Sequence, residues 1–275
     1  MTKIGLFFLL LLQLSFIKAQ DTYTFDTRFL YKLNYNPDSS DRSIFREEYF
    51  MLLANESLSL FQSSNKFYLD SILQSDYSKG NTLGDMASAS KYSTKFKYTI
   101  LKENRNITYY EFDRDFSPDL VYYKEYDNMD WQLVDTTLII NDLTCQLATV
   151  NYGGRVWNAW FCNEIPIQDG PYKFGNLPGL IVKLYDSEKS WNFDLVEIDP
   201  NLAVTVNVNK YPAKKLTMME KNDFIQQKES LSKNRLLINE SKGRIKINDA
   251  ESRKNMARNY SKFLQANSNK IEILP

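Results

Sequence analysis

The sequence predicts a mainly β protein, that is, a β-rich α+β chain with helices at the C-terminus. Its strands are expected to form either a single curved antiparallel sheet or half-barrel, or a β-sandwich. Aromatic residues make up 14% of the chain, with 18 Tyr and 17 Phe, and they favour pleated, half-buried strands. Short apolar segments follow one another with turn-like segments between them, and no helical pattern alternates with them. This succession is typical of antiparallel meanders rather than of a doubly wound parallel sheet.

The expected strands are short segments separated by polar or glycine-containing turns. They cover residues 26–33, 47–53, 58–61, 95–101, 107–112, 122–126, 131–134, 137–140, 181–185, 191–197 and 202–209, and residues 78–90 form a polar loop. A capping-box pattern from Thr217 to Glu220 predicts a helix that runs to about Arg235. A second helix is expected over residues 249–265, where Met256, Tyr260, Phe263 and Leu264 share one face.

The N-terminus has the pattern of a secretory signal peptide, with Lys3, an apolar stretch over residues 4–16 and Ala19 near the cleavage point. The apolar stretch is too short for a membrane span, so we expect no transmembrane segment in the mature chain. The expected domains are therefore a signal peptide, residues 1–19, and one β-rich domain, residues 20–275, which includes a basic helical region, residues 213–267. The predicted location is the periplasm, the outer-membrane surface or the medium.

Charge is balanced over the chain but not along it. There are 34 basic and 34 acidic residues in total, whereas the stretch from Lys210 to Lys270 holds 15 basic and 6 acidic residues, a net charge of 15 − 6 = +9. Such a stretch folds onto an acidic body, stays solvated or contacts an anionic surface such as lipid headgroups. An exported chain with a slightly acidic mature part is not expected to bind nucleic acid.

Histidine is absent from the chain. Its absence excludes Ser-His-Asp and Cys-His nucleophile systems and the common zinc sites. A calcium site at Asp38, Asp41 or Asp142 lacks the spacing of an EF-hand loop. We therefore expect neither a cofactor nor a bound metal, and any acid–base chemistry would fall to carboxylates.

The two cysteines are predicted to form a disulfide across a hairpin. Gly153-Gly154 is a two-residue turn signal, and a turn there pairs Tyr152 with Arg155. In that register Cys145 and Cys162 lie directly opposite each other at a non-hydrogen-bonded position, about 4.5 Å apart at Cα. An oxidising compartment favours the bridge. Two free buried thiols, or a redox pair, are the alternatives.

A double bend interrupts the strand pattern after this hairpin. Gly170-Pro171 is followed by Asn176, Leu177-Pro178-Gly179-Leu180 and Ile181, and the Pro-Gly pair fits a type II turn. Beside it we expect a polar patch formed by Arg155, Glu164, Asp169, Tyr172 and Lys173. Asp130, Glu164, Asp169 and Asp186 are the carboxylates that a glycosidase-like hydrolase would use, although solvated loop positions also account for them.

These residues resemble the GLPGLI family of exported Bacteroidetes proteins. The resemblance rests on residues 164–167, 170–174 and 177–181, and upstream on Trp131 and residues 145–148 and 154–161. It extends to residues 51–53, 59–64 and 70–71 and to the ending over residues 269–274. It departs from the family motif at Asn176, which stands where the first glycine is expected; asparagine tolerates left-handed backbone conformations. The family brings no activity, cofactor or catalytic residue that carries over.

Two classes of function fit the sequence. The first is a non-enzymatic envelope protein that binds an apolar or peptide-like ligand or an outer-membrane partner on a concave sheet. The second is a carboxylate-dependent hydrolase; a structural scaffold without a ligand is a further possibility. The lack of any nucleophile–base pattern favours the first class.

Overall fold

The structure is a computed structural model that describes residues 22–78, 90–113, 116–117, 119–209 and 215–273. The predicted signal peptide and most of the expected loop at 78–90 lie outside these residues. The strands are β1 (Thr22–Phe25), β2 (Thr27–Tyr35), β3 (Arg46–Ala54), β4 (Leu58–Ser63), β5 (Tyr98–Glu103), β6 (Asn106–Glu111), β7 (Leu120–Tyr126), β8 (Gln132–Ile140), β9 (Leu143–Tyr152), β10 (Arg155–Cys162), β11 (Leu180–Asp186), β12 (Trp191–Asp199), β13 (Val204–Asn207) and β14 (Leu216–Met218). The helices with described bounds are α1 (Ser64–Ser78), α3 (Lys221–Ser241) and α4 (Ala250–Gln265).

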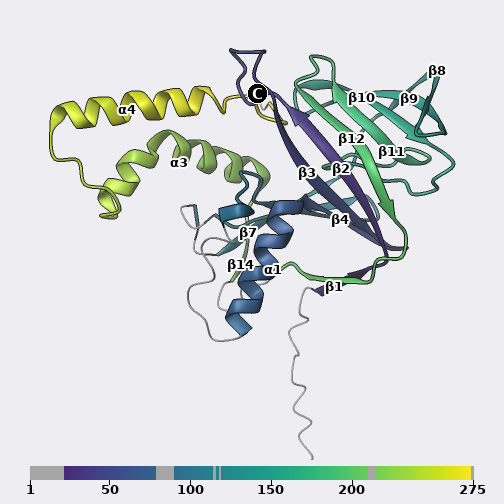
Figure 1. Ribbon diagram of the computed structural model, residues 1–275, viewed down its shortest axis with the longest axis horizontal. Coiled ribbons are helices and arrows are strands. Elements are labelled where there is room, and N and C mark those ends of the chain that lie inside the picture. The colour runs from purple at the N-terminus through teal and green to yellow at the C-terminus, as the bar shows by residue number, and fades with distance from the viewer. Residues whose placement is uncertain (1–21, 79–89, 114–115, 118, 210–214, 274–275) are drawn as a thin grey trace, which may run out of the picture.

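Twelve strands form one curved sheet in the order β14-β7-β6-β5-β4-β3-β2-β12-β11-β10-β9-β8 (Figure 1). All neighbouring pairs are antiparallel except β14 and β7. This confirms the mainly β class, and a single open sheet is present rather than a two-sheet sandwich. β7 ends at Tyr126 and β8 begins at Gln132, so a link that spans about 20 Å at most joins strands near opposite ends of the sheet. The sheet must therefore curl until these ends approach each other.

The inner face of the sheet carries the larger core. It is defined by buried side chains such as Tyr31 and Leu33 on β2, Phe50 on β3, Trp157 on β10 and Phe193 on β12. Alternation along β2 is regular, with every second residue buried. That pattern is the one expected for a strand with one covered and one open face.

The outer face is covered over half of its width only. The two-stranded ribbon of β1 and β13 packs there on β3 to β7, through Phe25, Val206, Met51, Leu60 and Leu101. The far end of β3, residues 50–54, is consequently buried on both sides, whereas its first four residues are half-buried or exposed. β8 to β12 and β2 keep their outer face uncovered by this ribbon.

Two helical assignments differ from the sequence prediction. Thr217 lies in β14, which pairs with β7, and the helix begins later, at Lys221, with an N-cap Glu220 whose side chain makes no capping bond. The expected capping box is therefore wrong, because pairing with the sheet takes its first residues. α1 was not expected at all. The second C-terminal helix is confirmed, since the Asp249 side chain accepts a hydrogen bond from Ser252 N at 2.7 Å and caps α4.

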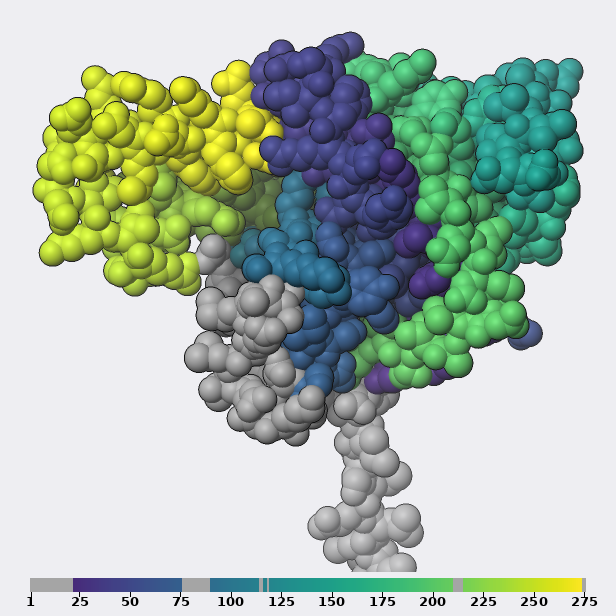
Figure 2. All heavy atoms as spheres, in the orientation of Figure 1, coloured from purple at the N-terminus to yellow at the C-terminus, as the bar shows by residue number. Residues whose placement is uncertain are grey.

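Helices α3 and α4 leave the sheet as an arm, and the chain then returns to the body (Figures 1 and 2). We call residues 221–265 the helical arm and residues 269–273 the return segment. Over the described residues, no helix is long and apolar enough to cross a membrane.

Candidate functional site

The segment between β10 and β11, residues 163–179, fills the inner side of the curled sheet, and we call it the plug. Its Tyr172, Phe174 and Leu177 belong to the inner core. The Phe174 ring lies 4.8 Å from Trp157 and 5.3 Å from Tyr152, centroid to centroid. The concave side, where we expected a ligand, is thus occupied by the chain itself.

The Pro-Gly turn of the plug is tighter than the type II turn expected. Gly179 N donates to Leu177 O at 2.7 Å, while Leu180 N donates to Ile165 O at 3.0 Å instead of closing a four-residue turn. Gly179 has a φ of +157°, and a Cβ atom there would lie 2.2 Å from Cys162 O. Glycine is required at this position by its backbone angle and by the close approach of β10.

Two non-glycine residues of the plug have left-handed backbone angles. Asn176 has φ +59°, the left-handed angle expected for it, and its side-chain amide donates to the carboxylate of Asp127 in the link between β7 and β8. Trp131 in the same link donates from Nε1 to Gly175 O at 3.0 Å. Tyr172 has φ +57°, which the sequence did not predict. The plug thus fastens the link that lets the sheet curl.

Asp169, a member of the expected polar patch, ties the plug to the middle of the sheet. Its carboxylate accepts from Lys102 on β5 and from Ser59 on β4. Lys102 also donates to Gly170 O at 2.8 Å and to Phe174 O at 3.2 Å. These bonds occupy the carboxylate with structural partners.

Lys173 is fully buried and forms the centre of a charged network. Its Nζ contacts the carboxylate of Glu125, lies 2.6 Å from Glu272 Oε1 and donates to the Tyr123 hydroxyl at 3.0 Å. Lys221, the first residue of α3, lies 2.6 Å from Glu125 and 2.9 Å from Glu272. Two lysines and two glutamates therefore neutralise each other where the plug, the arm and the return segment meet.

Burial alone would raise the pKa of Glu272, but the groups that contact its carboxylate have the larger, opposite effect. The charges of Lys173 and Lys221 and the hydrogen bond from Tyr172 lower the pKa to about 2. Glu272 is therefore ionised at neutral pH. The Tyr172 hydroxyl donates to Glu272 at 2.6 Å. Burial and the charge of Glu272 raise the pKa of Tyr172, so this hydroxyl stays protonated.

Arg155, the first residue of β10, holds the return segment from the other side. Its guanidinium pairs with the buried Asp186 at 2.7 Å, donates to Lys270 O from Nη2 at 2.6 Å and bonds the Asn269 side chain. Asn269 Nδ2 in turn donates to Asn36 O at 2.8 Å. Every part of this guanidinium has a partner within the chain.

The remaining predicted carboxylates do not join these groups. Glu164 accepts from Thr144 N at 2.8 Å on the exposed hairpin, and Asp130 is exposed in the link between β7 and β8. Asp186 is held by Arg155 and by Trp191 N. Of the expected patch, Tyr172 and Lys173 converge on Glu272, while Arg155 binds the neighbouring Asn269 and Lys270.

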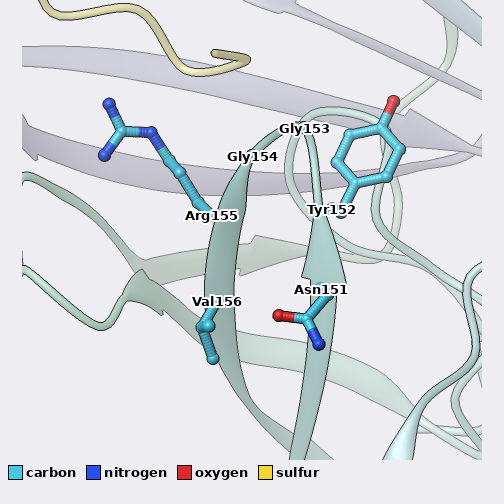
Figure 3. Close-up of a pocket in the computed structure, with 6 residues that line it drawn as sticks. All are labelled: Asn151, Tyr152, Gly153, Gly154, Arg155 and Val156. Atoms are coloured by element: carbon cyan, nitrogen blue, oxygen red, sulfur yellow. The ribbon is translucent and has the colours of Figure 1, made fainter. Parts of the chain in front are cut away.

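The cysteine hairpin has the predicted register. Tyr152 pairs with Arg155, and Cys145 and Cys162 form the disulfide with a Cα separation of 4.3 Å. A shallow hollow of about 230 Å³ lies at its turn, lined by residues 151–156. Arg155 and Tyr152 extend to opposite sides of this turn (Figure 3). Ile273 N donates to Gly153 O at 2.6 Å, so the return segment crosses Gly153-Gly154 closely.

A larger hollow, of about 540 Å³, lies on the uncovered outer face, and we call it the outer groove. Its lining residues are Asn34, Phe45, Leu138, Trp160, Lys183, Tyr185, Lys189 and Asn192. Tyr185 pairs with Asn158 on one side and with Asn192 on the other, so an aromatic ring sits in a row of amides. Sequence reasoning missed this site, because its residues come from five separate segments and share no motif.

One atom of the outer groove is left without a hydrogen-bond partner. Asn34 Oδ1 is buried and has no partner among the described residues. The ammonium of Lys183 is engaged by Asp194 at 2.5 Å, whereas no ion pair joins Lys189 to an acid within the described part of the chain. The groove therefore combines an apolar wall and a positive charge with an unsatisfied acceptor on one of its lining side chains.

A further pair of perturbed groups lies beside β3. Burial, reinforced by Lys270 and Arg46, lowers the pKa of Lys95 to about 8, and burial raises the pKa of Glu48. The Lys95 ammonium lies 4.3 Å from the centroid of the Tyr35 ring. Neither group lines the two hollows above, and no sequence pattern links positions 48 and 95.

No metal site is formed by the described residues: none of their acidic or cysteine side chains gather in groups of three or more suited to an ion. Asp38 and Asp41, considered for calcium, accept from Ser40 and Ser43 in local turns.

A family model described as a protein of unknown function (Porph_ging) matches residues 98–183, which include β5 to β10, the plug and the first strand residues after it. No curated protein matches the chain. Two solved structures of PNGF-II, in C2 and P21 space groups, have TM-scores of 0.52 and 0.53 at 10% sequence identity, covering 74% of this chain. The chain corresponds to 32–33% of the length of those proteins, and the likeness concerns the fold alone.

Proposed function

We propose that the protein is a non-enzymatic binding module of the cell envelope, and that its outer groove binds a peptide-like segment of a partner. The observation that carries the proposal is the unpartnered Asn34 Oδ1 in a hollow with apolar and aromatic walls. Export rests on the expected signal peptide, residues 1–19, and the periplasm or the outer-membrane surface is the proposed location. The resemblance to the GLPGLI family of exported proteins supports both the export and the proposed location.

The chemistry of the groove fits an extended peptide better than a lipid chain. A backbone N–H pairs with Asn34 Oδ1 once the Asn34 amide turns toward the groove, which removes an unsatisfied buried acceptor. An apolar side chain packs between Phe45, Leu138 and Trp160, and an acidic group pairs with Lys189. A lipid tail would leave the buried acceptor unpaired. Hydrolysis is not favoured, because Asp130, Glu164, Asp169 and Asp186 are held in separate surroundings.

Selection from a library of displayed random peptides tests the proposal. Wild-type protein should enrich peptides that combine an apolar and an acidic residue, and Asn34→Ala or Tyr185→Ala should lose that enrichment. Leu133→Ala, an exposed position of β8 that does not line the groove, is the matched control and should enrich the same peptides. No enrichment by the wild type, or unchanged enrichment by the groove variants, would contradict the groove as the binding site.

A further inference from the structure

The helical arm is held to the body along α3, where Lys228 and Arg235 pair with Glu111 and Asp113, and it has little buried surface beyond its base. At the base, Phe224 packs on the rings of Tyr109, Phe116 and Tyr123, and Lys221 pairs with Glu272 of the return segment. Phe224 is the one buried residue of α3, and α4 has none. The two helices project from the sheet into open space (Figures 1 and 2). The arm therefore contributes little to the hydrophobic core, and its presence is not explained by the stability of the fold.

Positive charge follows one line along α4. Lys254, Arg258 and Lys262 are spaced four residues apart, so they lie above one another on one side of the helix. All three are exposed, and no ion pair or hydrogen bond from their side chains is formed with the described residues. Like charges at this spacing destabilise an isolated helix slightly, so the row is unfavourable without an anionic partner.

The other side of α4 faces its neighbour helix. Met256, Tyr260 and Leu264 are half-buried there, and the Tyr260 hydroxyl donates to Ser232 O of α3 at 2.5 Å. The basic row consequently points away from α3. Lys242 and Lys246, in the connection between the helices, are exposed as well.

Each helix of the arm also exposes a large apolar side chain. Leu237 of α3 is 60% exposed and Phe263 of α4 is 58% exposed. Helices that lie in the interface of an anionic bilayer combine these two features: basic residues that contact headgroups and Phe or Leu side chains that enter the acyl boundary. An acidic protein would take up the charge but would leave these two side chains exposed.

We propose that the helical arm docks on the surface of a bilayer that contains anionic lipids, with Lys254, Arg258 and Lys262 facing the headgroups. The charge distribution sets the orientation. The stretch from Lys210 to Lys270 carries 15 basic and 6 acidic residues, and since the whole chain is neutral, the remainder is net acidic and is repelled by the same surface. The outer groove then stays accessible while the arm holds the protein at the membrane.

Co-sedimentation of the purified protein with vesicles tests the proposal. Binding should be strong to vesicles of phosphatidylglycerol and phosphatidylcholine in equal parts, weak to pure phosphatidylcholine, and reduced by salt, since exposed charges are screened. The triple variant Lys254→Gln, Arg258→Gln, Lys262→Gln should bind the anionic vesicles about 100-fold more weakly. Phe263→Ser should weaken vesicle binding less than the triple variant does. It should mainly reduce the binding that persists at high salt.

A control variant removes the same amount of charge from the body at positions outside the outer groove: Lys32→Gln, Lys91→Gln, Lys124→Gln. It should bind the vesicles as the wild type does. Equal binding to both vesicle types, or an arm variant that binds as the wild type does, would overturn the proposal. So would preferential binding to poly-glutamate without binding to vesicles, which would assign the arm to an acidic protein. Circular dichroism should show unchanged folding, because all three arm positions are exposed.

Discussion

The inner and outer faces of the sheet differ in what covers them. The inner face is filled by the plug, and its polar side chains are consumed by partners of the same chain, as Lys173 and Asp169 show. The outer face, from β8 to β2, keeps a groove in which Asn34 Oδ1 has no partner among the described residues. The most recognisable sequence motif therefore marks architecture, whereas the surface suited to binding carries no motif.

The largest effect is expected for Gly179→Ala. The new Cβ would lie 2.2 Å from Cys162 O at a φ of +157°, so the plug cannot keep its path, and we expect a loss of more than about 4 kcal/mol or no folded protein. Gly243→Ala is the control: its φ is +66°, but no atom lies within 4 Å of the added carbon, and only about 1 kcal/mol of strain is expected. Urea denaturation of both variants gives the loss of unfolding free energy for each. The difference between the two losses is the cost of the steric clash beyond that of the backbone strain. Equal losses would mean that the close approach to β10 does not matter.

Lys173→Met and Lys183→Met compare a lysine on each face. Lys173 is fully buried between two glutamates, and its removal leaves buried charge without its partner, at a cost of about 3–5 kcal/mol in unfolding free energy. Lys183 and Asp194 on the outer face are about one-third exposed, so the second change should cost about 1 kcal/mol or less. Chemical denaturation measures both, and a larger loss for Lys183→Met would reverse the comparison.

Loss of the disulfide should act on the start of the plug. Cys162 ends β10, and the bridge closes a loop with a sequence separation of 17. The double variant Cys145→Ala, Cys162→Ala should lose about 3 kcal/mol. Titration of thiols in the denatured, non-reduced wild type should find none, and adding reductant should not destabilise the double variant further. Two free thiols in the wild type would refute the bridge.

The charged network predicts a loss of stability in acid. The folded pKa of Glu272 is about 2, below its ordinary value of 4.5, so its contribution is complete above about pH 5 and is lost as the pH falls toward 2. The contribution at neutral pH is roughly 3 kcal/mol on this shift. Glu272→Gln should flatten the dependence of unfolding free energy on pH in this window. An unchanged slope in the variant would assign acid sensitivity to other carboxylates.

The smallest effect on stability is expected on the outer face. Tyr185→Ala should change the unfolding free energy by about 1 kcal/mol, because the side chain is half-buried with one side toward solvent. Any peptide selected by the wild-type groove should nevertheless bind this variant at least tenfold more weakly. Isothermal titration with that peptide measures the loss. If Tyr185→Ala unfolds the protein instead, the outer face is part of the core and the contrast between the faces fails.

Local chemistry explains which elements were predictable. The Gly153-Gly154 turn sets the register of its hairpin, and simple pairing arithmetic then places Cys145 opposite Cys162. The α4 helix was predictable for the same reason, since its apolar spacing and its Asp249 cap lie within a few residues of each other. In both cases the decisive contacts are close in sequence.

Long-range contacts explain the failures. Thr217 reads as a helix cap, but hydrogen bonding of β14 to β7 places it in a strand. Residues 172 and 173 were expected to form a polar patch near Arg155; their partner Glu272 is about a hundred residues away, and nothing in the local sequence announces it. The outer groove was beyond prediction because strand order, not residue pattern, assembles it.

Native-state hydrogen exchange of the plug tests most directly that the motif is architectural. Within the plug, Phe174 N donates to Pro171 O and Asn176 N donates to Gln168 O. If the plug is part of the core, these amides exchange as slowly as those of β10 and β11, through global unfolding only. Fast exchange of the plug beside protected strands, as in a mobile binding loop, would contradict the account.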